Sequence, residues 1–154
     1  MSKNKKGNQR GSSTESFISL AESLLERGDL PSNTKLTDTY LYVPQQSESG
    51  FDVGLSTIPE LTIEWGTWHS PIPEYSLKNA FSLVHSMLTS QMRVRELYKW
   101  PFSYRGYLQR FDQGDWVTIQ VMGLLIWNPL APLRERIYQN TSLDSDAKHG
   151  ANGT

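Results

Sequence analysis

The chain has 154 residues, a hydrophobic content of 37% and a formal net charge of −1, which suits one domain with a modest core. Cysteine is absent, and this excludes disulfides, thiolate metal sites and cysteine nucleophiles. No apolar run approaches the roughly 18 residues that a membrane-spanning helix needs. The first residues lack the apolar segment of a secretory signal, so we expect the protein to be made in the cytosol and to stay there.

Positive charge gathers at the start of the chain. Residues 1–12 contain Lys3, Lys5, Lys6 and Arg10 and no acid. Their composition predicts a flexible basic arm that is attracted to an anionic membrane or to a nucleocapsid. A solubilising tail is the alternative interpretation of the same residues.

A short amphipathic helix is predicted over residues 15–27. Ser12 and Glu15 fit a capping box before it, and Gly28 stands where a helix usually ends. Its apolar side chains fall at helical spacing. The helix either packs on its own domain or docks on a neighbouring copy, and in the second case the self-association residues are Phe17, Leu20 and Leu24.

The middle of the chain predicts strands and then a long helix. Alternating or β-branched residues indicate strands over residues 39–43 and 61–68, separated by a loop over 45–54 and followed by an irregular, proline-rich stretch over 69–75. Ser76 is a suitable N-cap, and an apolar stripe that includes Leu88 and Met92 predicts a helix from there to about Tyr98. Pro101 ends it.

A hairpin is predicted over residues 102–122, because two alternating segments flank the turn sequence DQGD at Asp112–Asp115. We expect one aromatic row of its first strand in the core and the cationic row outside. Leu133, Ile137 and Tyr138 suggest a short closing helix. Residues 140–154 are too polar for a core and predict a disordered tail.

The expected fold is therefore α+β, with residues 13–139 as a single domain. A small antiparallel sheet would carry one long helix, with a short helix near each end of the chain.

Nothing in the sequence favours catalysis. His69, His85 and His149 have no partner at metal-ligand spacing, and the P-loop, dinucleotide, nucleophile-elbow and zincin motifs are missing. Asp112 and Asp115 fit a turn better than an acid–base pair. We therefore expect a protein that is not an enzyme, with no metal and no cofactor.

Binding surfaces are better supported. Rings alternate with Lys99, Arg105 and Arg110 along residues 98–111, a pattern that can stack on bases and reach phosphates but that also occurs on ordinary exposed sheets. Tryptophan beside proline in irregular segments suits a membrane interface or a partner. The candidate interaction surface adds three such residues: Trp68, Trp100 and Trp127.

Several segments together resemble the rhabdovirus matrix proteins, in the compact form of plant-infecting members. The resemblance covers residues 60–138 and the basic arm, and the matching segments are LTIEW, PIPEYSLKNAFSLVHSM, KWPFSYRGYLQRF, GDWVTIQV and NPLAPLRERIYQ. The PPxY budding motif of many animal-virus members is missing, since Ile72-Pro73-Glu74-Tyr75 lacks its first proline. Recruitment of budding machinery through a WW domain is therefore not expected.

The resemblance implies a structural protein of the virion. Such a protein self-associates into an open helical assembly, condenses the viral nucleocapsid and lies beneath the envelope on the anionic inner leaflet, with the viral glycoprotein as a further partner and only weak binding to nucleic acid. It would occupy the host cytoplasm and the periphery of host membranes, and a visit to the nucleus stays open. The alternative is an RNA-binding viral accessory protein, such as a silencing suppressor or a movement-type factor.

Overall fold

The computed structural model describes residues 10–124 and 130–144, with side chains from residue 17 onward. Two helices and nine strands are formed by these residues. In chain order they are α1 (Arg10–Glu26), β1 (Lys35–Leu36), β2 (Tyr40–Val43), β3 (Val53–Ser56), β4 (Thr62–Trp65), β5 (Trp68–Pro71), α2 (Leu77–Met87), β6 (Met92–Lys99), β7 (Phe102–Asp112), β8 (Asp115–Gly123) and β9 (Arg134–Gln139).

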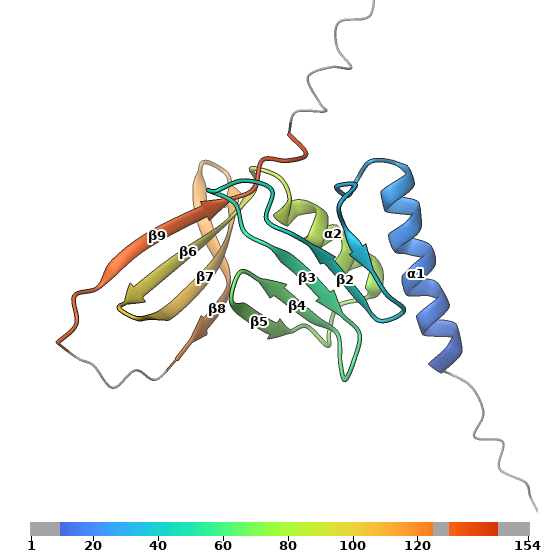
Figure 1. Cartoon of the computed structure of the whole chain (residues 1–154), viewed down its shortest axis with the longest axis horizontal. Helices are drawn as coiled ribbons and strands as arrows, with labels where there is room; N and C mark the ends of the chain where they lie inside the picture. Colours follow the sequence, from blue (N-terminus) through green and yellow to red (C-terminus); the bar gives the residue numbers. More distant parts are fainter. Residues whose placement is uncertain (1–9, 125–129, 145–154) are drawn as a thin grey trace, which may run out of the picture.

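The architecture is mostly β, so the expected α+β fold with one long helix on a small sheet is wrong. Sheet A has the strand order β1-β2-β3-β4-β5 and sheet B the order β8-β7-β6-β9, and all pairings are antiparallel. Sheet B extends to one side of sheet A, and the two helices lie on the other side of the molecule (Figure 1). One apolar cluster joins both sheets and both helices.

The predicted strand over residues 61–68 is a tight hairpin in the structure. β4 ends at Trp65, and the chain turns at Gly66, whose φ of 60° favours glycine. The return strand β5 pairs Trp68 with Trp65, so the stretch expected to be irregular contains a strand. Both indole rings are buried.

The long helix predicted from Ser76 to Tyr98 is wrong beyond its first three turns. Ser76 caps α2 as expected, since its Oγ accepts a hydrogen bond from the Asn79 N–H at 3.2 Å. The helix stops at Met87, and Leu88 leaves helical geometry. Residues 92–99 instead form β6, because Met92 and Val94 alternate with Arg93 and Arg95 and bury their side chains on one face.

The β7–β8 hairpin is confirmed with its turn, where Gln113 and Gly114 both have positive φ. The segment expected to be a closing helix is β9, which pairs with β6 through Val94↔Tyr138 and Leu97↔Glu135. The expected aromatic row of β7 does not lie in the core. Phe102 is exposed, and Gly106 and Leu108 supply the buried positions.

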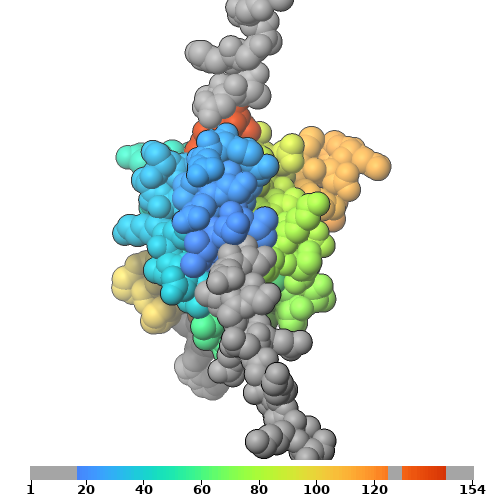
Figure 2. Space-filling model, turned by 90° about the vertical axis from the view of Figure 1, so that its right-hand side faces the viewer, coloured from blue at the N-terminus to red at the C-terminus, as the bar shows by residue number. Residues whose placement is uncertain are grey.

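The predicted first helix is confirmed, but it begins at Arg10, so Ser12 lies within it and does not cap it. Gly28 follows its end with φ 77°. The Phe17 ring is fully buried, with its centroid 5.3 Å from that of Phe81 in α2. Figure 2 views the molecule from this side, with α1 in front and α2 beside it. The helix therefore packs on its own chain.

Residues 140–144 belong to the packed part of the chain, although a disordered tail was expected from Asn140. Asn140 is 1% exposed, and its side chain bonds the backbone of Phe51 and of Met87. Residues 145–154 lie outside the described part. No helix among the described residues has the length and apolar character that crossing a bilayer requires.

Candidate functional site

One end of sheet B gathers exposed apolar side chains. The β6–β7 turn, the end of β8 and the start of β9 meet there, because Lys99 pairs with Phe102 and Tyr98 with Arg134, and the Leu124 N–H donates to the Tyr104 carbonyl at 3.0 Å. Figure 1 shows this end projecting away from sheet A. We name it the tip surface, and it consists of Trp100, Phe102, Leu124, Leu130 and Leu133.

The tip surface is unusually apolar for a solvated position. Trp100 is 74% exposed and Leu130 is 93% exposed, and large apolar side chains gathered in this way mark interaction sites more often than single ones do. A shallow hollow of about 450 Å³ lies beside them, lined by Pro101, Phe102, Leu124 and the inner residues Trp68 and Met122. The tip therefore offers apolar contact area to a membrane or a partner.

Cations surround these apolar side chains. The Lys99 Nζ and the Arg105 guanidinium lie 5.4 and 5.3 Å from the Tyr104 ring centroid, and Arg134 is exposed at the start of β9. The hydroxyl of Tyr107 raises the pKa of Arg105, with smaller electrostatic contributions from the Tyr104 and Tyr107 phenol groups. Three positive charges thus stand beside exposed rings and aliphatic side chains, a combination that suits an anionic membrane surface.

Half of the predicted interaction residues meet at this surface. Lys99, Trp100 and Arg105 lie together, as expected. Trp68 instead lies between the two sheets and is buried. Arg110 is near the other end of β7, where it pairs with Met92 and Val117. Trp127 lies outside the described residues.

The self-association residues lie on α1. Phe17 is part of the core, whereas Leu20 and Leu24 line a groove between α1 and α2 together with Phe81 and His85. Of the basic arm, Arg10 is the first residue of α1, and Lys3, Lys5 and Lys6 lie outside the described residues.

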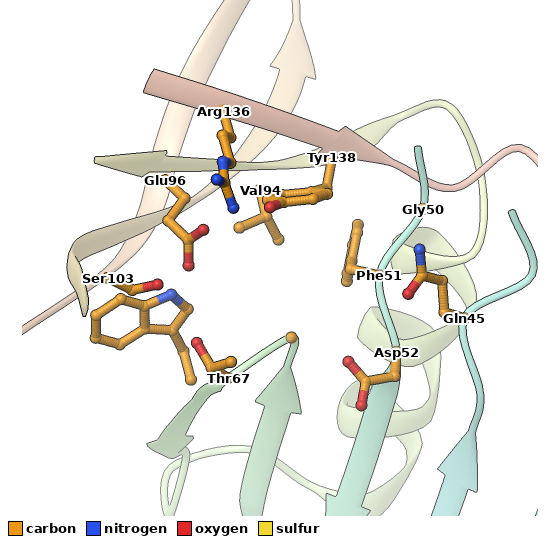
Figure 3. Close-up of a pocket in the computed structure, with 12 residues that line it drawn as sticks. Gln45, Gly50, Phe51, Asp52, Thr67, Val94, Glu96, Ser103, Arg136 and Tyr138 are labelled. Carbon is orange, nitrogen blue, oxygen red and sulfur yellow. The ribbon is translucent and has the colours of Figure 1, made fainter. Parts of the chain in front are cut away.

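A second hollow of about 320 Å³ lies between the two sheets. Figure 3 shows Glu96 and Arg136 directed into it from sheet B, opposite Asp52 and Gln45 of sheet A. Glu96 is only 6% exposed. It sits across from Arg136 on β9, and the pKa of Arg136 is raised by the Tyr138 hydroxyl foremost and by Glu96 to a smaller extent.

This cleft is rich in polar groups that face one another. The Asp52 carboxylate accepts a hydrogen bond from the Tyr42 hydroxyl at 3.2 Å, and the Arg136 guanidinium lies 4.4 Å from the Tyr98 ring centroid. Local sequence patterns did not indicate that Glu96 and Arg136 would lie opposite each other, because Glu96 was expected on one helix and Arg136 on another. Neighbouring carboxylate and guanidinium groups provide both hydrogen-bond acceptors and donors, so this cleft could bind a small polar ligand.

Two of the three histidines lie in the part of the chain that the structure describes. His69 is exposed on β5, and His85 is half-buried near the end of α2. No cluster of three or more histidine and acidic side chains that could hold a metal ion occurs within residues 10–124 and 130–144.

The sequence interpretation also missed Arg93 and Arg95, which stand on the exposed face of sheet B. The run Met92-Arg93-Val94-Arg95 alternates with period two, and this was the available signal. The helical stripe through Leu88 and Met92 concealed it.

Compared with known proteins, the chain matches no protein-family model, no curated protein and no solved structure.

Proposed function

We propose that the protein is a non-enzymatic assembly protein of the matrix type, which binds the anionic inner leaflet of a membrane through the tip surface. The observation that carries the proposal is the exposure of Trp100 and Leu130 at the end of sheet B that also carries Lys99, Arg105 and Arg134. Indole and aliphatic side chains enter the headgroup region, and the cations attract acidic lipids. The sequence resemblance to matrix proteins supports the same function.

The energetics suit reversible binding. Each cation near an anionic surface contributes about 1 kcal/mol, and complete burial of a large apolar side chain contributes about 1.5–3 kcal/mol. Trp100 and Leu130 are exposed enough to contribute in this way, and three cations add to it. The surface would therefore hold the protein on a membrane without a spanning segment.

The test is flotation with vesicles of phosphatidylcholine alone or with phosphatidylserine added. We expect flotation only with the acidic lipid. The double variant Trp100→Ser, Leu130→Ser should lose at least about tenfold in apparent affinity, since tenfold corresponds to only about 1.4 kcal/mol and even partial burial of two such side chains contributes that much. Ile58→Ser is the matched control, because Ile58 is also highly exposed but lies on the β3–β4 connection of sheet A. Equal binding by the tip variant and the control contradicts the proposal.

The basic arm would add a second electrostatic contact with membrane or nucleocapsid. Replacement of Lys3, Lys5, Lys6 and Arg10 by alanine should weaken vesicle binding at low salt and leave the fold intact. Unchanged binding would remove the arm from the proposal and leave the tip surface untouched.

A further inference from the structure

Sheet B has a second surface with a distinct composition, on the face opposite the core. Alternate residues of β6 point there, and the strand registers align them with their neighbours: Ile137–Arg95–Tyr107–Val121 form one row and Gln139–Arg93–Gln109–Thr118 the next. We name this the outer face. It contains Arg93, Arg95, Leu97, Lys99, Arg105, Tyr107, Gln109, Phe111, Trp116, Thr118, Val121, Glu135, Ile137 and Gln139.

The outer face is partly open: Gln109 is covered, Arg93, Arg95, Tyr107 and Trp116 are half-buried, and the side chains around them are exposed. Val94 and Leu108 on the reverse side are buried against the core, whereas Phe111 is 49% exposed and Val121, Thr118 and Ile137 are also exposed. The end of the β7–β8 hairpin (orange) stands clear of the rest of the molecule (Figure 2). A four-stranded sheet face is thus free to take a ligand along its width.

Four cations, Arg93, Arg95, Lys99 and Arg105, share this face with one carboxylate, that of Glu135. Arg95 donates to Glu135 at 2.8 Å, which offsets a single charge. Arg93 donates through Nε to Gln109 at 2.8 Å, and that bond leaves its charge in place. The face is therefore electropositive and attracts polyanions.

Aromatic rings fix these cations in position. The Arg93 guanidinium lies 4.2 Å from the Trp116 ring centroid, and the Arg95 guanidinium lies 5.5 Å from that of Tyr107. Phe111 and Trp116 are adjacent, with centroids 5.2 Å apart and planes tilted by 60°. Cation–π contacts order a guanidinium without neutralising it, so ring faces and charges are presented together.

We propose that the outer face binds single-stranded nucleic acid. Bases would stack on Tyr107, Phe111 and Trp116, and Arg93 and Arg95 would contact the phosphates, which is the combination that single-strand binding requires. Tyr107 and Phe111 stand four residues apart on β7, which is roughly 13.6 Å and about four times the spacing of about 3.4 Å between neighbouring nucleotides of a stacked strand. A bound strand would therefore lie extended with its bases separated.

The arrangement favours a nucleic acid over a membrane as the ligand. On the outer face Arg93 and Arg95 lie on β6 and Arg105 on β7, the two central strands. The exposed aliphatic side chains Val121 and Ile137 lie on the two edge strands. A membrane surface needs the reverse, with apolar groups that enter the lipid and cations at the margin, as on the tip surface. The proposal does not depend on the proposed membrane function, since Arg93 and Trp116 take no part in the tip.

The test is fluorescence anisotropy of a labelled 12-nucleotide oligouridine titrated with the whole chain at several salt concentrations. We expect Arg93→Gln, Arg95→Gln to weaken binding at least tenfold and to reduce the salt slope by about 1.4, which is about 0.7 for each phosphate contact on a single strand. Trp116→Leu should weaken binding about five- to hundredfold, which is the loss of one stacked base.

Arg110→Gln is the matched control. Arg110 is an exposed arginine of β7 whose neighbours Met92 and Val117 place it on the opposite side of the sheet, so binding should not change. Circular dichroism checks that every variant is folded. The tip variant Trp100→Ser, Leu130→Ser should bind oligouridine normally, although its binding to vesicles is weakened.

Three results would each overturn the inference. The first is oligouridine binding by the wild type that does not depend on salt or is absent. The second is an equal loss in Arg110→Gln and in the Arg93 and Arg95 variant. The third is that the outer-face variants bind oligouridine normally but no longer bind phosphatidylserine vesicles. This result would identify the outer face as a membrane-binding surface.

Discussion

The indole ring of Trp68 lies directly against the backbone of Gly106, so that a Cβ at Gly106 would stand 2.7 Å from both Cδ1 and Cε2 of the ring. This contact brings β5 of sheet A onto the inner side of β7, and the adjacent Ser70 and Gln120 side chains share a hydrogen bond of 3.1 Å. Only glycine allows this approach. Because Gly106 has no side chain, β5 of sheet A can approach β7 of sheet B at this point.

Gly106→Ala should destabilise the fold by about 1–3 kcal/mol, because the added methyl group would overlap the Trp68 ring and force the ring or β7 to shift. Gly123→Ala is the matched control in the neighbouring strand, since its added Cβ would meet nothing closer than the Arg105 Nε at 3.5 Å. Urea unfolding measures both. A midpoint for Gly106→Ala equal to that of Gly123→Ala would show that Trp68 does not pack here.

A second structural contact is made by Asn140, which joins β9 to sheet A and to α2. Its Oδ1 accepts from the Phe51 N–H, and its Nδ2 donates to the Phe51 and Met87 carbonyls, all at 3.0 Å. Asn140→Ala leaves three buried backbone groups without these partners, so we expect a loss of about 2–4 kcal/mol. Asn79→Ala, at an exposed position of α2, should change the urea midpoint little, and a small effect at both positions would contradict the role of Asn140.

Local signals predicted the local parts of the fold. The β7–β8 hairpin follows from alternation around a turn whose Gln113 and Gly114 have positive φ, and the first helix from apolar spacing that ends before Gly28. These elements depend on neighbours in sequence. Their correct prediction therefore required no knowledge of the rest of the chain.

Two segments that were predicted as helices are strands: residues 92–98 and the closing segment. In the structure they pair with each other. β6 and β9 pair along Arg93–Tyr98, and short apolar segments of this kind fit a helical stripe as well as a strand until the partner is known. Leu133 and Ile137 stand four apart and favoured a helix, yet the pairing with β6 decided the outcome. Tertiary pairing of this range cannot be found from spacing alone.

For the candidate site residues, too, local signals succeeded where exposure depends on neighbours in sequence and failed where it depends on a distant strand. Trp100 was predicted at a surface because tryptophan next to proline in an irregular segment is difficult to bury, and it is exposed there. Trp68 carried the same local signal but is covered by sheet B, which contributes Gly106 from a distant strand. Arg93 and Arg95 of the outer face were missed for the same reason as β6, because they were expected on a helix, whereas Lys99 and Arg105 had been predicted as possible phosphate contacts.

Tyr40 makes stability depend on pH in alkali. Burial foremost, and then the hydrogen bond that its hydroxyl donates to Glu64 at 2.7 Å, raises the pKa of Tyr40 above its ordinary value of 10.0. The folded state therefore holds this proton more tightly than the unfolded state does. The stabilisation is complete below about pH 10 and is lost as the pH rises from there toward the raised pKa.

The variant Tyr40→Phe tests this linkage. It should be less stable than the wild type at pH 8, because Glu64 loses its donor, and the gap between the two urea midpoints should narrow at pH 11. Tyr75→Phe is a control, because the Tyr75 hydroxyl makes no hydrogen bond within residues 10–124 and 130–144. A gap of constant width from pH 8 to pH 11 would show that Tyr40 ionises as freely in the folded state as in the unfolded chain.

Variants of α1 distinguish a role in the core of its own domain from a role in contact between copies. If Phe17 is a core residue, as its full burial and its contact with Phe81 indicate, then Phe17→Ala should cost about 3–4 kcal/mol of stability. Leu24→Ala, at a partly buried position in the groove between the helices, should cost less. Oligomer size by sedimentation, measured well below the unfolding midpoint, should be unchanged in Phe17→Ala. A variant that keeps its unfolding midpoint but sediments as a smaller species would instead assign Phe17 to contact between copies, since a side chain that packs only against its own domain cannot alter assembly without altering stability.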